Sequence, residues 1–453
     1  MDLKDLFLTP FYLALFYGLA FAVRKRFTNS LTKKYFIPAL SVKFLGAISL
    51  GLIYQFYYGG GDTFNYYLHT KIIYQAFGDS FAAGLKILTT NGTYEPSIVR
   101  YTGQMFWWEP DSTEMFVVKI ASLLGLLCFN TYTVIALFFA FISFCGMWAM
   151  YITFVRIYPL AYKNLAIAVL FLPSVFFWGS GLMKDALCIG ALGWVFYGFY
   201  HVFIVKKSLL LASLLGSLGA YIVISAKIYI LLSFTPPALF WIFNENNARI
   251  KSATARLLLK PFFLVAGAAI AYVAATNLTA GDKRFDVEKI GERSKITQEY
   301  LSEYVTSGSA YNIGELDGTL GSIVKVAPQA VIVALFRPFL FEARNPVMLL
   351  SALEATFFLY LTLSLIYKTG FFMSLKLIAS EPILTFCFIF SIIMAIGVGT
   401  TSGNFGTLVR YKIPLMPFFL SALFIMQNKA QGARRRIKKA PLIAQGRTSP
   451  QAA

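Results

Sequence analysis

The chain has 453 residues, of which 58% are hydrophobic and only 13% are charged. Soluble domains carry roughly 25% charged residues, so this composition excludes an ordinary soluble protein and indicates a helical protein that crosses a membrane many times. The net charge of +19 would suggest nucleic acid in a soluble chain, but here basic cytoplasmic loops and contact with anionic lipids explain it, and no nucleic acid is expected as a partner.

Apolar stretches long enough to cross a bilayer recur along the chain. A bilayer core needs about 20 apolar residues per helix, and about eleven stretches approach this length. The shorter segments 115–129 and 320–335 are expected to be interfacial or re-entrant helices. The sequence therefore predicts an all-α polytopic membrane protein with a single transmembrane domain over residues 1–427. The expected spans are 7–23, 36–57, 131–155, 164–182, 186–205, 208–225, 228–244, 261–277, 346–367, 382–399 and 412–427.

The distribution of basic residues predicts an orientation in the membrane. Lys and Arg concentrate in cytoplasmic loops, and they gather here between alternate spans and in the run 434–439. The N-terminus is therefore expected outside and the C-terminus in the cytoplasm, with the protein in the inner (cytoplasmic) membrane. Two long loops, 59–114 and 277–345, then face outward. Residues 428–453 are expected to form a disordered basic tail that meets anionic lipid.

The sequence offers no recognisable metal or nucleotide motif. It contains no Walker loop, no GxGxxG and no nucleophile elbow. His69 and His201 do not form a metal site, and the cysteines lie in apolar runs without the spacing of metal ligands. No cofactor is required by the sequence, and no residue pattern supports a divalent metal. The cysteines are Cys128, Cys145, Cys188 and Cys387.

A polar stretch follows directly on the second expected span. Glycines 59–61 interrupt the apolar run and let the backbone turn at the membrane surface, and Asp62 comes next. A carboxylate at a membrane boundary is unfavourable unless it is hydrated, paired or used. Two interpretations remain open: Asp62 is a catalytic base at the outer face, or it caps a helix by accepting the backbone N–H groups of Phe64 and Asn65.

Cations recur at the outer ends of the expected spans, where the positive-inside rule keeps them scarce. Such cations need an anion, and a phosphate or diphosphate suits both the arginine fork and the point charge of lysine. Ordinary pairing is the alternative, for example Arg337 with Glu342 or Lys184 with Asp185. The outer-face cations are Lys184, Lys227, Arg337, Arg344, Arg410 and Lys412.

Two short motifs carry a resemblance. Gly61-Asp62-Thr63, followed by Tyr66-Tyr67, lies in the first outer loop, and Arg410-Tyr411-Lys412-Ile413-Pro414 precedes the last span. This arrangement resembles the lipid-dependent glycosyltransferases of the GT-C superfamily and the related bacterial exopolysaccharide and O-antigen polymerases. In that group an acidic residue follows an early span. Many members show two adjacent acids there, whereas Asp62 stands alone in this chain.

The resemblance implies transfer of a sugar, or of an oligosaccharide repeat, from a polyprenyl-phosphate or -diphosphate donor to an acceptor at the outer face, in cell-surface glycan synthesis. Asp62 would then be the catalytic base. A transporter or flippase for a lipid-linked or anionic solute is the competing class, since broken helices can line a path. The residues expected to hold the donor phosphate are Lys184, Lys227, Arg337 and Arg410, and those expected to bind sugar or acceptor are Tyr66, Trp107, Trp108 and Asn404.

Overall fold

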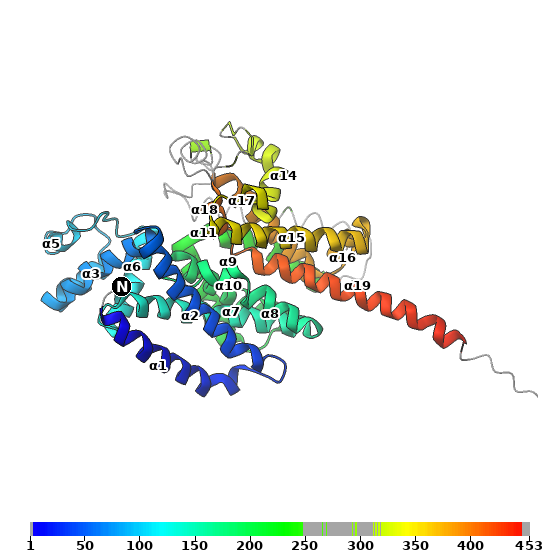
Figure 1. The fold of residues 1–453 in the computed structure, drawn as a ribbon, viewed down its shortest axis with the longest axis horizontal. Coiled ribbons are helices and arrows are strands. Elements are labelled where there is room, and N and C mark those ends of the chain that lie inside the picture. Colours follow the sequence, from blue (N-terminus) through cyan, green and yellow to red (C-terminus); the bar gives the residue numbers. More distant parts are fainter. Residues whose placement is uncertain are drawn as a thin grey trace, which may run out of the picture.

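The computed structural model describes residues 3–247 and 319–445, together with scattered positions between 265 and 317. Within these residues the chain forms a bundle of helices (Figure 1), so the expected all-α polytopic class is confirmed for this part. The first half comprises α1 (Leu3–Phe27), α2 (Lys33–Leu52), η1 (Ile53–Tyr57), α3 (Asp62–Asp79), α4 (Phe81–Thr89), α5 (Val99–Thr102), α6 (Thr113–Leu127), α7 (Tyr132–Ile157), η2 (Pro159–Ala161), α8 (Tyr162–Leu170), α9 (Pro173–Trp178), α10 (Lys184–Phe199), η3 (Tyr200–Val205) and α11 (Leu209–Asn247).

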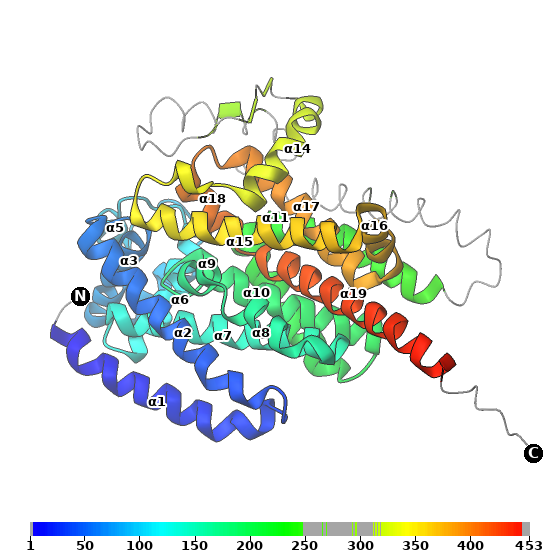
Figure 2. The same ribbon diagram turned by 45° about the vertical axis from the view of Figure 1, so that its right-hand side comes forward.

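The second half packs against the first through α15, α17, α18 and α19 (Figure 2). Its helices are α14 (Leu320–Phe336), η5 (Leu340–Glu342), α15 (Pro346–Thr369), α16 (Phe371–Ser380), α17 (Pro382–Thr401), α18 (Phe405–Tyr411) and α19 (Met416–Gln445).

Among the described residues, seven helices are long and apolar enough to cross a membrane, or eight if a bent pair counts as one span. The expectation of eleven spans is therefore not confirmed. The seven are Leu3–Phe27, Lys33–Tyr57, Tyr132–Ile157, Lys184–Val205, Leu209–Glu245, Pro346–Thr369 and Pro382–Thr401, and the bent pair is Phe405–Tyr411 with Met416–Gln431.

Several expected spans differ from the observed helices. The expected span 164–182 is broken, because α8 ends at Leu170 and a separate short helix, α9, starts at Pro173. Proline cannot donate a backbone hydrogen bond and disfavours helical geometry in the residue before it. The expected span 412–427 belongs to the bent pair, whose halves meet at 68°. Apart from scattered positions, the expected span 261–277 and the part of the second outer loop before residue 319 lie outside the described residues.

The shorter expected segments form helices, while the tail differs from the expectation. Segment 115–129 corresponds to α6, and segment 320–335 to α14. The backbone of α19 stays helical to Gln445, through much of the segment expected to be a disordered tail. Alanine, glutamine, lysine and arginine are frequent in this segment, and all of them favour helix.

The long helix α11 reverses direction at Lys227, where the backbone leaves helical geometry (φ −152°, ψ 72°). Gly216, before the break, packs against the backbone of Gly198 in α10. Trp241, after the break, has its ring 5.6 Å from that of Phe199, the last residue of α10. A straight helix would separate Gly216 from Trp241 by roughly 37 Å. The two arms therefore form the hairpin expected from spans 208–225 and 228–244, with Lys227 at its turn.

The centre of the bundle is formed by α7 and α10, whose backbones lie close together. Gly146 of α7 faces Gly190 and Gly193 of α10, and a side chain at any of these positions would meet the opposing backbone. Small residues permit such close approach between membrane helices. In contrast, α1 lies at one side of the bundle with most of its surface exposed, as expected of a lipid-facing helix (Figure 2).

Candidate functional site

The start of α3 places Asp62 at one end of the bundle. Gly61 has φ +117°, a conformation that side-chain-bearing residues rarely adopt, and a Cβ there would lie 2.9 Å from the ring of Tyr54. The N–H groups of Phe64 and Asn65 donate to the carbonyl of Gly61. Asp62 is thus the first residue of α3 and not its cap, so the helix-cap interpretation of this carboxylate is wrong.

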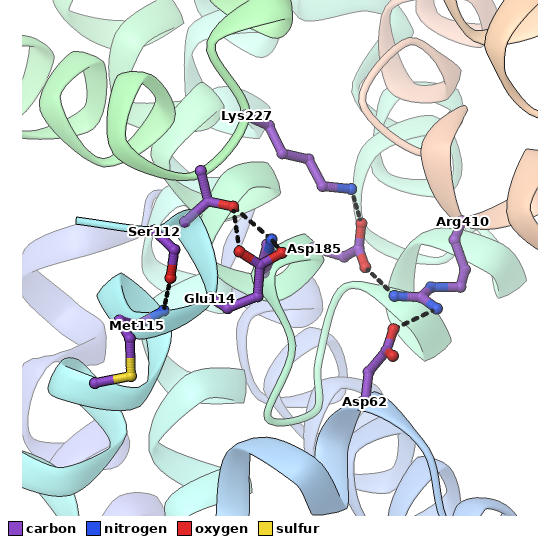
Figure 3. A network of polar contacts seen from close by, with 9 residues as sticks. Asp62, Ser112, Glu114, Met115, Asp185, Lys227 and Arg410 are labelled. Atoms are coloured by element: carbon purple, nitrogen blue, oxygen red, sulfur yellow. Dashed lines mark hydrogen bonds and ion pairs between the residues drawn. The ribbon is translucent and has the colours of Figure 1, made fainter. Parts of the chain in front are cut away.

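Four charged side chains from four different helices form one network (Figure 3), which we call the charge network: Asp62, Asp185, Lys227 and Arg410. Arg410 places Nη1 2.9 Å from Asp62 Oδ2 and Nη2 3.3 Å from Asp185 Oδ2. Lys227 Nζ donates to the other oxygen, Asp185 Oδ1, at 2.5 Å. The network thus contains equal numbers of positive and negative charges.

Local structure explains how the helices present these charges. Asp185 lies in the first turn of α10, where a carboxylate interacts favourably with the helix dipole. Arg410 lies in the last turn of α18, which is the favourable end for a cation. Lys227 occupies the non-helical turn of the α11 hairpin, from which its ammonium reaches α10.

Exposure differs sharply within the charge network. The Asp185 side chain is 2% exposed and Lys227 is 9% exposed, whereas the Asp62 side chain is 48% exposed. Buried charges are stable only when paired and hydrogen-bonded, and the pair Asp185–Lys227 meets this condition. Asp62 is therefore the acid of the network that an incoming molecule can reach.

Aromatic rings lie against the cations of the charge network. The guanidinium of Arg410 lies 5.7 Å from the ring centroid of Trp178, and Lys227 Nζ lies 4.3 Å from that of Tyr411. Ring faces attract cations at these distances. Arg410 Nε is buried and makes no hydrogen bond with any residue the structure describes. One donor of this guanidinium is thus not satisfied by the described residues.

Lys184 does not pair with its neighbour Asp185. Its ammonium donates to Glu114 and to Thr113 at the start of α6, each at 2.6 Å. Ser112 caps α6 by accepting the N–H of Met115, which places Glu114 in the first turn (Figure 3). The Lys184–Glu114 pair therefore ties α6 to the beginning of α10, next to the charge network.

Arg337 belongs to a separate cluster. Its guanidinium forms an ion pair with Glu342, which also accepts the N–H of Phe339 at 2.7 Å. Its nearest aromatic ring is that of Phe405, 5.1 Å away. The alternative of ordinary pairing therefore describes Arg337. Lys412 is buried and donates to the carbonyl of Arg337 at 3.2 Å.

The residues expected to bind sugar or acceptor lie in different environments. Tyr66 is buried one turn after Asp62 on α3; burial raises the pKa of its phenol, and the carboxylates of Asp62 and Glu114 add to the shift. Trp107 lies against His69, with ring centroids 4.0 Å apart. Trp108 is half-buried. Asn404 caps α18 by accepting the N–H of Thr407 at 2.8 Å, so its side-chain oxygen already has a structural partner.

The structure thus brings Asp62, Lys227 and Arg410 together, with Lys184 in a neighbouring pair, and leaves Arg337 apart. No group of three or more His, Cys, Asp or Glu side chains suited to a metal occurs among the described residues. No family model matches the chain, and neither does any curated protein or solved structure.

Asp185 is the central residue that the sequence did not single out as part of the site. It follows a stretch with Pro173, two glycines and Lys184, and it precedes an apolar span, which are the same signals that drew attention to Lys184. The signal that could have identified Asp185 is Lys227, the lone cation in the turn of the hairpin that follows. Two lone opposite charges at the same end of adjacent antiparallel helices are expected to pair.

Proposed function

We propose that the protein transfers a sugar, or an oligosaccharide repeat, from a polyprenyl-phosphate or -diphosphate donor to an acceptor hydroxyl at the outer membrane face. The observation that carries the proposal is the contact between the half-exposed Asp62 and the largely buried Arg410. It places an accessible carboxylate beside a guanidinium that retains an unpaired N–H donor. A base and an anion-binding group side by side are what such a transfer requires.

In the proposed reaction, Asp62 accepts the proton of the acceptor hydroxyl while that oxygen attacks the anomeric carbon of the donor. The bond between the anomeric carbon and the phosphate oxygen breaks, and the lipid phosphate or diphosphate departs with the bonding electron pair. Arg410 then stabilises the negative charge that develops on the departing oxygen. Lys227 contributes positive charge through the same network, while Asp185 keeps both cations in place.

The direct test uses purified full-length protein in lipid nanodiscs, with native lipid-linked sugars as donors and a labelled product as the readout. Transfer of label to an acceptor, lost in Asp62→Asn and in Arg410→Gln, supports the proposal. Absence of any product from the wild-type protein with a full set of native donors and acceptors would overturn it.

A transporter for a lipid-linked or anionic solute is the second candidate, and a specific feature favours it. Lys43 in α2 and Glu354 in α15 are buried well inside spanning helices, at opposite ends of the short helix α9 that follows the break after α8. Charges within spans next to broken helices are typical of transport paths. Movement of a labelled lipid-linked sugar across proteoliposomes, without a covalent product, would favour this function over transfer.

A further inference from the structure

The short helix α9 lies inside the bundle, between α2 on one side and α15 and α18 on the other. It has only six residues, so most of its backbone N–H and C=O groups belong to its first or last turn. The first N–H and last C=O groups of a helix have no partner within it. Away from water, these groups need partners from elsewhere in the protein.

Glu354 of α15 supplies the partner at the beginning of α9. Its carboxyl group accepts both the N–H of Ser174, at 2.9 Å, and the hydroxyl of Ser174, at 2.6 Å. The residue before α9, Leu172, has no side chain that can cap a helix. A carboxylate from another helix thus does what a capping residue usually does, at the end where the helix dipole favours negative charge.

Lys43 of α2 supplies the partner at the end of α9. Its ammonium donates to the carbonyl of Gly179 at 2.7 Å, to that of Val175 at 3.4 Å and to Ser143 at 3.0 Å. No carboxylate pairs with Lys43 within the described part of the chain. Cations are favoured at helix C-termini, so Lys43 and Glu354 match the two ends of α9 in sign.

The approach of α2 to α9 is close enough to depend on a glycine. A Cβ at Gly46, one turn after Lys43, would lie 2.2 Å from the carbonyl oxygen of Phe176. The last residue of α9, Trp178, in turn presents its ring to Arg410 and lies 6.4 Å from the ring of Tyr54. The position of α9 therefore determines where the Trp178 ring meets the charge network.

We propose that Lys43 and Glu354 are positioning residues, which clamp α9 at its two ends so that Trp178 holds the Arg410 guanidinium in place. Neither residue contacts Asp62 or Arg410, and their effect passes through α9. The structural part stands on the contacts above; only its consequence for turnover rests on the proposed function.

The position of Trp178 can be measured without any enzymatic assay. The emission of Trp178 in full-length protein in nanodiscs is obtained by comparing each variant with the same variant carrying Trp178→Phe. We expect Lys43→Met and Glu354→Met to shift this emission to longer wavelength and to increase its quenching by acrylamide. Lys43→Gln retains a hydrogen-bond donor and Glu354→Gln retains an acceptor. We therefore expect these two variants to change the Trp178 emission in the same direction but by less.

The matched control is Leu40→Ala, which removes packing from the same helix at a fully buried position one turn before Lys43. It should leave the Trp178 emission unchanged. The inference fails if the charge-removing variants keep the wild-type Trp178 signal, or if Leu40→Ala shifts that signal equally. If the Met variants do not fold, the same comparison with the Gln variants decides.

Turnover supplies the second measurement. We expect kcat for transfer to fall about 10²-fold in Lys43→Met, the loss associated with misplacing a group by about 1 Å, while the KM for the donor changes less. A wild-type protein without transfer activity would overturn the proposed function alone, because the emission measurement still decides the role of Lys43 and Glu354. A shifted Trp178 signal with unchanged kcat would show that the clamp does not serve the reaction.

Discussion

Arg410 Nη1 lies 2.9 Å from the Asp62 carboxylate, although Asp62 begins the helix after the second span and Arg410 lies in the first half of the bent pair near the end of the chain. The same guanidinium reaches Asp185, whose second oxygen binds Lys227. Arg410 is therefore shared between an accessible and a buried carboxylate. Substitutions at Asp62, at Asp185 and Lys227, and at Arg410 can therefore test separately the roles of the accessible acid, the buried pair and the shared guanidinium.

Replacement of Asp62 by Asn should abolish transfer while the protein remains folded. The substitution keeps the size of the side chain and removes the proton acceptor, and a positioned base contributes about 10²–10⁴-fold to a rate. The measurement is the initial rate with purified protein. Asp111→Asn, at an exposed carboxylate of the same loop, is the matched control and should keep the wild-type rate. Retained activity in Asp62→Asn would remove this residue from the chemistry.

The buried pair Asp185–Lys227 should behave as a unit in thermal unfolding. Asp185→Asn leaves the buried ammonium of Lys227 uncompensated and should cost about 3–5 kcal/mol. Lys227→Met should cost less, because Asp185 keeps Arg410 as a partner. The double variant should lose less than the sum of the single losses, because neither charge then remains alone. Melting temperatures in nanodiscs measure this coupling. Strictly additive losses would show that the two side chains do not stabilise one another.

Arg410 and Arg337 should respond differently to the same change. Arg410→Gln should lower the transfer rate by about 10²–10³-fold, as expected when a donor to a developing negative charge is removed. Arg337 is paired with Glu342 outside the charge network, so Arg337→Gln should lower the melting temperature and leave the rate within a few-fold of wild type. Equal losses of rate in the two variants would place Arg337 at the site after all.

The buried imidazole of His69 predicts a pH dependence of stability. Burial lowers the pKa of His69 to about 4, below the ordinary value of 6.5. Between these values the unfolded chain binds a proton that the folded chain does not, so stability should fall as pH drops from about 6.5 towards 4. His69→Phe keeps a ring against Trp107 and cannot titrate.

The measurement for His69 is the difference in melting temperature between wild type and His69→Phe across pH 4–7.5. Because other groups titrate equally in both proteins, only the difference reports on His69. We expect wild type to lose stability towards low pH more steeply than the variant. A difference that does not change with pH would contradict the buried, neutral imidazole.

The expected orientation can be tested with single cysteines in a cysteine-free background. Tyr94 lies on the first long loop and Lys25 in the last turn of α1, and both side chains are exposed. A membrane-impermeant maleimide should label Tyr94→Cys in intact cells and Lys25→Cys only after permeabilisation. The reverse pattern would place the charge network on the cytoplasmic side and would exclude a reaction at the outer face.

Composition and apolar length predicted the helical class and most of the long helices, because both depend on local sequence. The Lys227 turn was predicted for the same reason, since a lone charge interrupts two apolar runs. Other features depend on tertiary contacts. Pro173 interrupts an expected span, and the ends of the short helix that follows receive hydrogen-bond partners from Glu354 and Lys43.

The partners of the charged side chains were predicted least well. Ordinary pairing, which the sequence left open as an alternative to anion binding, describes Lys184, Lys227, Arg337 and Arg410, because each contacts a carboxylate. Asp185 follows Lys184 in the sequence, and a pair between them was the alternative considered. Its actual partners are Lys227 of α11 and Arg410 of α18, which lie near Asp185 only in the folded bundle. The helix-cap role of Asn404 was missed as well, although asparagine before a helix is a known capping signal.

The hairpin of α10 and α11 has a consequence for how the chain enters the bilayer. Asp185 and Lys227 are brought together by consecutive segments, so their charges can neutralise each other as soon as both have left the ribosome. Arg410 is synthesised much later, when Asp185 can already be paired with Lys227. Biogenesis can thus insert the costly acid early, as half of a neutral pair, and complete the charge network only with the final segments.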